Sequence, residues 1–209
     1  AGIFLPMGVA IYQTDKESDL HIAVVTANAQ SKILGKETRL LGELEFRIDK
    51  VITQLFPNAK HTYNKASLPE ARKLLTTYAL DTKGEDWEDV KEGLEENFED
   101  QFDKAGFVMP SYFDFSEQLG ENSPYDFYTT YSICKLEVIA SVSKVSPEAA
   151  AFAPCTTMMY KKKGENKIVM GFTAVYNWLS SAVITDKSSQ KALMKAQGDF
   201  EGILKDVTK

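Results

Sequence analysis

The chain has 209 residues, of which 44% are hydrophobic and 26% are charged, and this composition excludes a disordered chain and leaves room for one large or two small domains. The formal net charge of -6 at pH 7 opposes attraction to nucleic acid and to anionic membranes, so no nucleic-acid partner is expected. No run of sequence approaches the roughly 18 apolar residues of a membrane span. The local basic cluster Lys161 to Lys163 is expected in a solvated hairpin turn.

The N-terminal part of the chain is predicted to form two strands and a helix. Strand-like runs at Ile3 to Tyr12 and Leu20 to Asn28 are joined by a polar turn at Thr14 to Asp19. A helix is expected from Thr38 to Leu55, because apolar residues recur there every three to four positions and Pro57 follows. Residues 1–57 are therefore predicted to form a β-β-α unit.

A polar connector, expected at residues 58–73 with a short helical turn near Pro69, separates this unit from a complete domain at residues 74–209. The elements expected in that domain follow from the apolar period of each segment. In chain order they are a strand at Leu74 to Leu80, a helix at Trp87 to Lys104, strands at Phe107 to Phe115 and Asp126 to Cys134, a short helix at Leu136 to Val142, strands at Ala151 to Tyr160 and Ile168 to Val175, and a helix at Lys187 to Val207.

The last two strands and the last helix repeat the N-terminal unit. Phe4, Pro6, Tyr12 and Glu17 align without gaps with Phe152, Pro154, Tyr160 and Glu165. A four-residue insertion in the next loop, about one helical turn, then keeps the apolar stripes of the two long helices in register. The shared order of elements predicts an internal duplication in which residues 1–57 are a half-repeat. A hairpin with one helix buries too little apolar surface alone, so the half-repeat must complete its sheet against the second domain, another subunit or a missing N-terminal segment.

Residues 74–209 resemble the bacterial and archaeal domain of unknown function 302 family. The resemblance rests on three segments, which are Ala105-Gly106-Phe107 after an acidic helix, Tyr131-Ser-Ile-Cys134 before a short helix, and Phe152-Ala-Pro-Cys155 at the start of a strand that ends at Tyr160. It implies a compact α+β domain of the TATA-binding-protein-like type, with an antiparallel sheet, two helices on one face and the order β-α-β4-α. The family brings no established activity. The chain departs from the family where Lys135 and Leu136 follow the first cysteine in place of Asn-Pro, which puts any role of that turn in doubt.

Cys134 and Cys155 are the residues predicted to carry chemistry, if any do, because one ends a strand and the other begins a strand at the same edge of the expected sheet. Three states are open to them. A disulfide would close a loop of about 20 residues and stabilise the fold in an oxidising compartment. Free thiols would act as small buried hydrophobic groups. A metal or redox site would need further ligands, and no CxxC, HExxH or Cys-His cluster occurs in the sequence, so no metal and no cofactor is expected.

Aromatic side chains supply the remaining candidates for a binding site. Tyr128 and Tyr131 lie in a strand rich in aromatic residues, where a tyrosine hydroxyl can orient a ligand in an apolar cavity. Trp178, at a strand-to-helix junction, is a candidate for the rim of such a cavity. There is no GxSxG elbow, GxGxxG loop or P-loop, which argues against a serine hydrolase of the elbow type and against nucleotide binding by those loops.

These observations favour a non-catalytic module that binds a small molecule or a protein partner. One alternative is a thiol-dependent or metal-dependent enzyme or redox protein that uses Cys134 and Cys155. Another is a structural homo-oligomer that forms through the N-terminal half-repeat. The chain begins at Ala1 without a methionine, which fits a mature form after signal cleavage, or equally a trimmed chain, and favours a periplasmic or secreted location.

Overall fold

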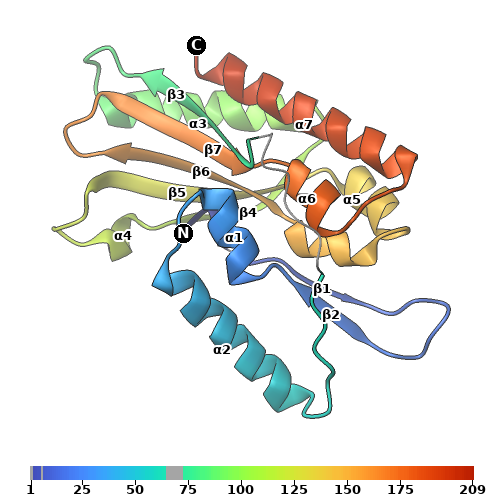
Figure 1. Ribbon diagram of the computed structural model, residues 1–209. Coiled ribbons are helices and arrows are strands. Elements are labelled where there is room, and N and C mark those ends of the chain that lie inside the picture. Colours follow the sequence, from blue (N-terminus) through green and yellow to red (C-terminus); the bar gives the residue numbers. More distant parts are fainter. Residues whose placement is uncertain (1, 6, 65–72) are drawn as a thin grey trace.

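The computed structural model describes residues 2–5, 7–64 and 73–209, which form a five-stranded sheet with helices and a separate two-stranded hairpin (Figure 1). The helical turn predicted near Pro69 lies outside the described residues. In the part of the chain that is described, no helix has the length and apolar character needed to cross a membrane.

The five-stranded sheet is antiparallel throughout and has the strand order β3-β7-β6-β5-β4. Its strands are β3 (Leu75–Asp81), β4 (Val108–Asp114), β5 (Tyr125–Cys134), β6 (Cys155–Lys162) and β7 (Lys167–Thr173). Because neighbouring side chains in a strand point to opposite faces, Tyr131, Met159 and Met170 share one face and enter the main core.

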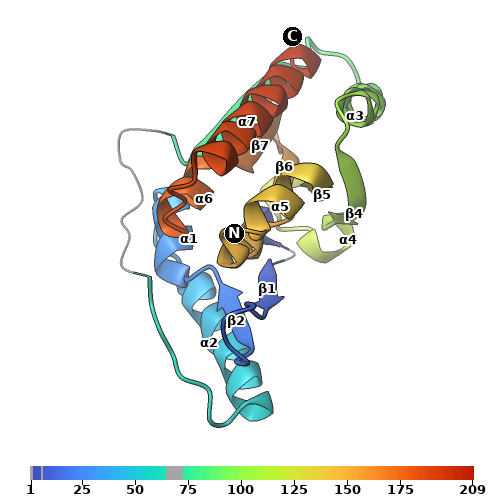
Figure 2. The same ribbon diagram turned by 90° about the vertical axis from the view of Figure 1, so that its right-hand side faces the viewer.

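Two long helices, α3 (Trp87–Lys104) and α7 (Lys187–Val207), cover that face of the sheet (Figure 2). Each starts at an aspartate whose carboxylate accepts a hydrogen bond from a backbone N–H of the first turn, Asp86 from Glu88 at 2.9 Å and Asp186 from Ser189 at 2.7 Å. Phe98, Phe102 and Phe200 contribute aromatic rings from the helices to the core. The predicted α+β class and the order β-α-β4-α with helices on one face are therefore confirmed.

One end of the sheet is closed by shorter elements. These are α5 (Leu136–Ser143), the 3₁₀ helix η2 (Pro147–Phe152) and α6 (Tyr176–Ser181), which follow β5 and β7. Val142, Trp178 and Leu193 from α5, α6 and α7 form a second apolar cluster there. A further short helix, α4 (Ser116–Leu119), connects β4 with β5.

The N-terminal part consists of η1 (Gly2–Phe4), β1 (Val9–Tyr12), β2 (His21–Val24), α1 (Ala27–Leu34) and α2 (Arg39–Leu55), which we name the N-terminal half-unit. Both strands are shorter than the sequence predicted, because η1 replaces the start of the first predicted strand and α1, which was not predicted, replaces the end of the second. Local contacts set both ends of α1. At its start, the Thr26 hydroxyl accepts a hydrogen bond from Ala29 N at 3.2 Å, and at its end Gly35 adopts the left-handed conformation with φ of 63°.

The two predicted repeats correspond in their detailed strand pairing. The pairs Val9↔Val24, Ala10↔Ala23, Ile11↔Ile22 and Tyr12↔His21 of the hairpin align with Thr157↔Phe172, Met158↔Gly171, Met159↔Met170 and Tyr160↔Val169 of β6 and β7. Each hairpin is followed by a short and a long helix, α1 and α2 in one case and α6 and α7 in the other. This correspondence supports the duplication, while the domain boundaries at residues 57 and 74 stay predictions.

Candidate functional site

Cys134, Cys155 and Trp178 line one small apolar cavity of about 30 Å³ at the closed end of the sheet. Cys134 ends β5, and Cys155 begins β6 opposite Ile133. Other lining residues come from the helices around the strand ends and the turn before α6, namely Val138, Ile139, Val175, Leu193, Ala196 and Phe200. The structure thus brings three of the five predicted site residues together.

The chemistry of this apolar cavity is set by burial. Both cysteines are free. Burial, and secondarily the neighbouring Cys134, raises the pKa of the Cys155 thiol to about 12, and burial also raises the pKa of Cys134. Both groups are therefore protonated at neutral pH and are poor nucleophiles.

The cation at the same cavity, Lys135, is held by other partners. Its Nζ donates to Ala105 O at 2.9 Å and to Asp199 Oδ2 at 3.2 Å, and it lies 4.9 Å from the centre of the Phe107 ring. It is therefore not directed at either thiol. Within residues 2–5, 7–64 and 73–209, no group of three or more His, Cys, Asp or Glu side chains is arranged to hold a metal ion.

The two candidate tyrosines lie elsewhere, on opposite faces of β5. Tyr131 lies in the main core, where its hydroxyl donates to Glu95 Oε1. Tyr128 lies on the other face and stacks on Tyr160 with ring centres 5.6 Å apart. The structure therefore does not bring them to the apolar cavity, and the binding role of all five residues stays a prediction.

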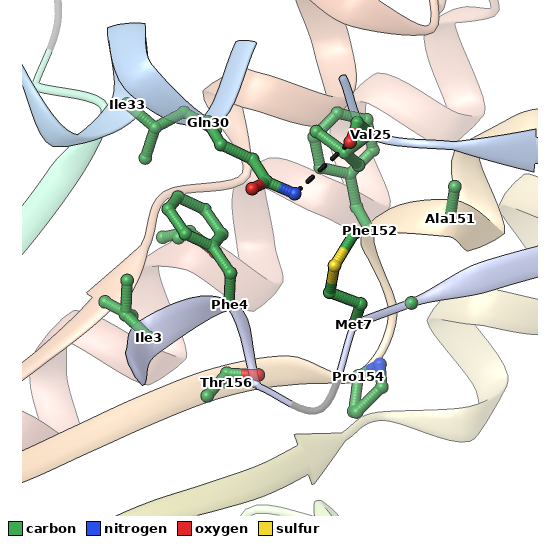
Figure 3. A pocket seen from close by; sticks show the side chains of 12 residues that line it. Ile3, Phe4, Met7, Val25, Gln30, Ile33, Ala151, Phe152, Pro154 and Thr156 are labelled. Carbon is green, nitrogen blue, oxygen red and sulfur yellow. Dashed lines mark hydrogen bonds between the residues drawn. The ribbon is translucent and has the colours of Figure 1, made fainter. Parts of the chain in front are cut away.

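A second cavity, of about 40 Å³, lies between the N-terminal half-unit and the sheet (Figure 3). We name it the inter-unit cavity. The half-unit contributes Ile3, Phe4, Met7, Gly8, Val25, Gln30 and Ile33, and the second unit contributes Ala151, Phe152, Pro154, Thr156 and Thr173. The sequence did not predict this cavity, although two residues that it aligned as repeats, Phe4 and Phe152, both line it.

Gln30 is the main polar side chain of the inter-unit cavity and was missed by sequence reasoning. Its exposed fraction is 2%, and its Nε2 donates to Val25 O at 3.2 Å. Its Oε1 is buried and has no hydrogen-bond partner among the described residues. Figure 3 shows Nε2 turned toward Val25 and Oε1 turned away from it, on the side of Phe4.

Comparison with known proteins identifies the architecture. No family model matches the chain, and no curated protein matches it. Among solved structures, the chain is similar to the crystal structure of an uncharacterized conserved protein, DUF302, from Bacillus stearothermophilus, with a TM-score of 0.52 and 16% sequence identity. The chain has a DUF302-like fold. The match covers all of that protein and 66% of this chain, so about a third of the chain lies outside the DUF302-like fold.

Proposed function

We propose that the protein is a non-catalytic interaction module and that its N-terminal half-unit associates with a second copy of the chain. The observation that supports the proposal is that apolar side chains of β1 and α2 are exposed in the half-unit, although the side chains aligned with them in the second unit are buried. A thiol-dependent activity is not proposed, because burial keeps Cys134 and Cys155 protonated.

The hairpin carries one part of this surface. Val9 and Ile11 lie on the same face of β1 and are exposed, Ile11 to 64%. Their aligned residues, Thr157 and Met159, are fully buried in the second unit, where α3 and α7 cover the sheet. The hairpin therefore presents the face of a sheet without the layer of helices that buries it elsewhere in the same chain.

Helix α2 carries the other part. Val51 and Leu55 are 53% and 67% exposed, whereas the aligned Ile203 and Val207 of α7 are buried. Exposed apolar side chains that cluster on a surface are typical of interaction sites. The half-unit thus exposes apolar side chains on both its hairpin and its long helix.

Unpaired strand edges favour a second copy as the partner. Within the described residues, β1 and β2 pair only with each other, whereas β6 and β7 are flanked by β5 and β3. A two-stranded hairpin is marginally stable alone, and a two-fold axis can pair two identical edges. A pair of half-units would contain four strands and two α2 helices. The second unit has the same number of elements in the four strands β5-β6-β7-β3 and the two helices α3 and α7.

The proposal is tested by the mass of the protein in solution. We expect light scattering to give twice the chain mass of 23.3 kDa. Val51→Glu places a charge at an exposed apolar position of α2 and should convert the dimer to a monomer. The matched control is Val145→Glu, because Val145 is similarly exposed, at 58%, but lies after α5 in the second unit.

The salt dependence provides a further readout. Both copies carry a formal charge of -6, so an interface held by apolar contacts should strengthen as salt screens their repulsion. A monomer at all protein and salt concentrations, or equal loss of the dimer in both variants, would contradict the proposal.

A further inference from the structure

We propose that the inter-unit cavity binds a neutral small molecule that donates a hydrogen bond from an O–H or N–H group to Oε1 of Gln30. This site is separate from the surface proposed for dimer formation, and it does not depend on that association.

The orientation of the Gln30 amide determines which kind of group the cavity can accept. A backbone carbonyl only accepts hydrogen bonds, so the contact with Val25 O requires the NH₂ group of Gln30 on that side. The oxygen of the amide is thereby left as a buried acceptor without a partner in the described part of the chain, on a side chain that lines the cavity. A buried acceptor without a partner destabilises the folded state, and a ligand that donates to it relieves that cost.

The lining residues limit the charge of the ligand. Among the described residues, no Asp, Glu, Lys, Arg or His side chain lines the inter-unit cavity. An ionised ligand would lose its hydration there without gaining a counter-charge, which is strongly unfavourable. The cavity is therefore suited to a neutral molecule.

The volume and the apolar side chains limit the ligand further. One water needs about 10–15 Å³ measured in the same way, so about 40 Å³ accommodates roughly three waters or a few heavy atoms of a ligand. Phe4, Met7 and Phe152 provide an apolar wall beside Gln30, and the Thr156 side chain lies across the cavity (Figure 3). A hydroxyl or amide on a short aliphatic group fits these surroundings.

Isopropanol and acetone are matched probes of this chemistry, because they have the same size and only isopropanol can donate a hydrogen bond. We expect isopropanol to shift the NMR signals of the Gln30 side-chain amide in a saturable manner. The tightest binding possible for such a small molecule corresponds to a dissociation constant of about 40 µM, so the titration must extend into the millimolar range. Acetone should bind about tenfold more weakly, because it leaves Oε1 without a partner.

Three variants distinguish the effect of the hydrogen bond to Gln30 from the effect of the cavity volume. Gln30→Met keeps the length of the side chain and should remove the preference for isopropanol. Binding to this variant is measured from the NMR signals of Thr156, which also lines the cavity. Ala151→Met should fill the cavity and abolish binding of both probes while leaving Gln30 in place. Gln54→Met is the control at an exposed glutamine of α2 and should bind as the wild type does.

Three results would contradict the proposal. Equal affinity of the wild type for the two probes would show that Oε1 does not select a donor. A preference that persists in Gln30→Met would place the recognition elsewhere, and the absence of saturable binding would show that the cavity holds only water. If Gln30→Met fails to fold, the wild type and Ala151→Met still decide between these results.

Discussion

At the scale of single residues, burial changes what a side chain can do. Cys134 and Cys155 were the residues that the sequence favoured for chemistry, and the structure does place them together. Their surroundings nevertheless suppress the thiolate, because burial raises the pKa of both thiols and Lys135 is bonded to Ala105 and Asp199 instead. Proximity in the fold was thus predictable from the strand order, whereas reactivity was decided by the helices that close the cavity.

The Cys155 thiol is expected to react far more slowly in the folded protein than in the unfolded chain. Burial raises its pKa from 9.0 to about 12, so the thiolate fraction at pH 8 falls by roughly a thousandfold. Iodoacetamide labelling followed by mass spectrometry, in buffer and in urea, measures the two rates. Because the pKa is higher in the folded state, Cys155 should also lower the free energy of unfolding as pH rises above about 9. Equal labelling rates would show that the thiol is accessible and ionised.

Lys161 shows how one residue departs from its predicted environment. The sequence placed Lys161 to Lys163 in a solvated turn, but β6 continues to Lys162 and Lys161 falls on the face of the sheet covered by helices. It is only 7% exposed and pairs with Asp126. Lys162 and Lys163 are exposed as predicted. The prediction was therefore wrong for Lys161, because the end of a strand depends on its neighbours and not on local charge.

At the scale of secondary structure elements, the long amphipathic helices were the most predictable. The limits of α3 and α7 agree with the sequence prediction, Trp87 to Lys104 and Lys187 to Val207. Their apolar period is long and uninterrupted, and each has an aspartate at its start. By contrast, α1 is a helix of eight residues, and its sequence was read as the end of a strand followed by a loop because so short a segment carries little periodic signal.

The aligned helices α7 and α2 should respond differently to the same substitution. Leu204→Ala in α7 removes a fully buried side chain and should lower the free energy of unfolding by about 2–5 kcal/mol. Leu55→Ala in α2 removes an exposed one and should change it by less than about 0.5 kcal/mol in the monomer. Urea unfolding at low protein concentration measures both values. A large effect of Leu55→Ala under those conditions would mean that α2 is packed within the monomer.

At the scale of the whole molecule, the half-unit is joined to the sheet by a close backbone contact. A Cβ atom added at Gly8 would lie 2.3 Å from Ala151 O and 2.5 Å from Ala153 O. These separations are too short for any side chain. The backbone of the half-unit therefore rests directly against the end of η2, beside the inter-unit cavity.

Gly8→Ala is expected to loosen this junction. The overlap should cost about 1–3 kcal/mol, and hydrogen exchange should become faster in β1 and β2 while β6 and β7 keep their protection. The matched control is Gly42→Ala in α2, where an added Cβ meets nothing within 4 Å. That change should leave the junction intact and favour the helix by up to about 1 kcal/mol. Unchanged exchange in Gly8→Ala would show that the half-unit is not held at this point.

The sequence by itself determined the α+β class and the order β-α-β4-α of the second unit, because these follow from local apolar periods, and its resemblance to the DUF302 family in three short segments indicated the fold. It also indicated that one unit occurs in a complete and a partial form. Only the tertiary structure decided that Ile203 and Val207 of α7 are buried while the aligned Val51 and Leu55 of α2 are exposed. It also decided that the side-chain oxygen of Gln30 is buried without a hydrogen-bond partner among the described residues. The physical reason is that burial depends on which distant segments cover a side chain, and no local pattern records what covers it.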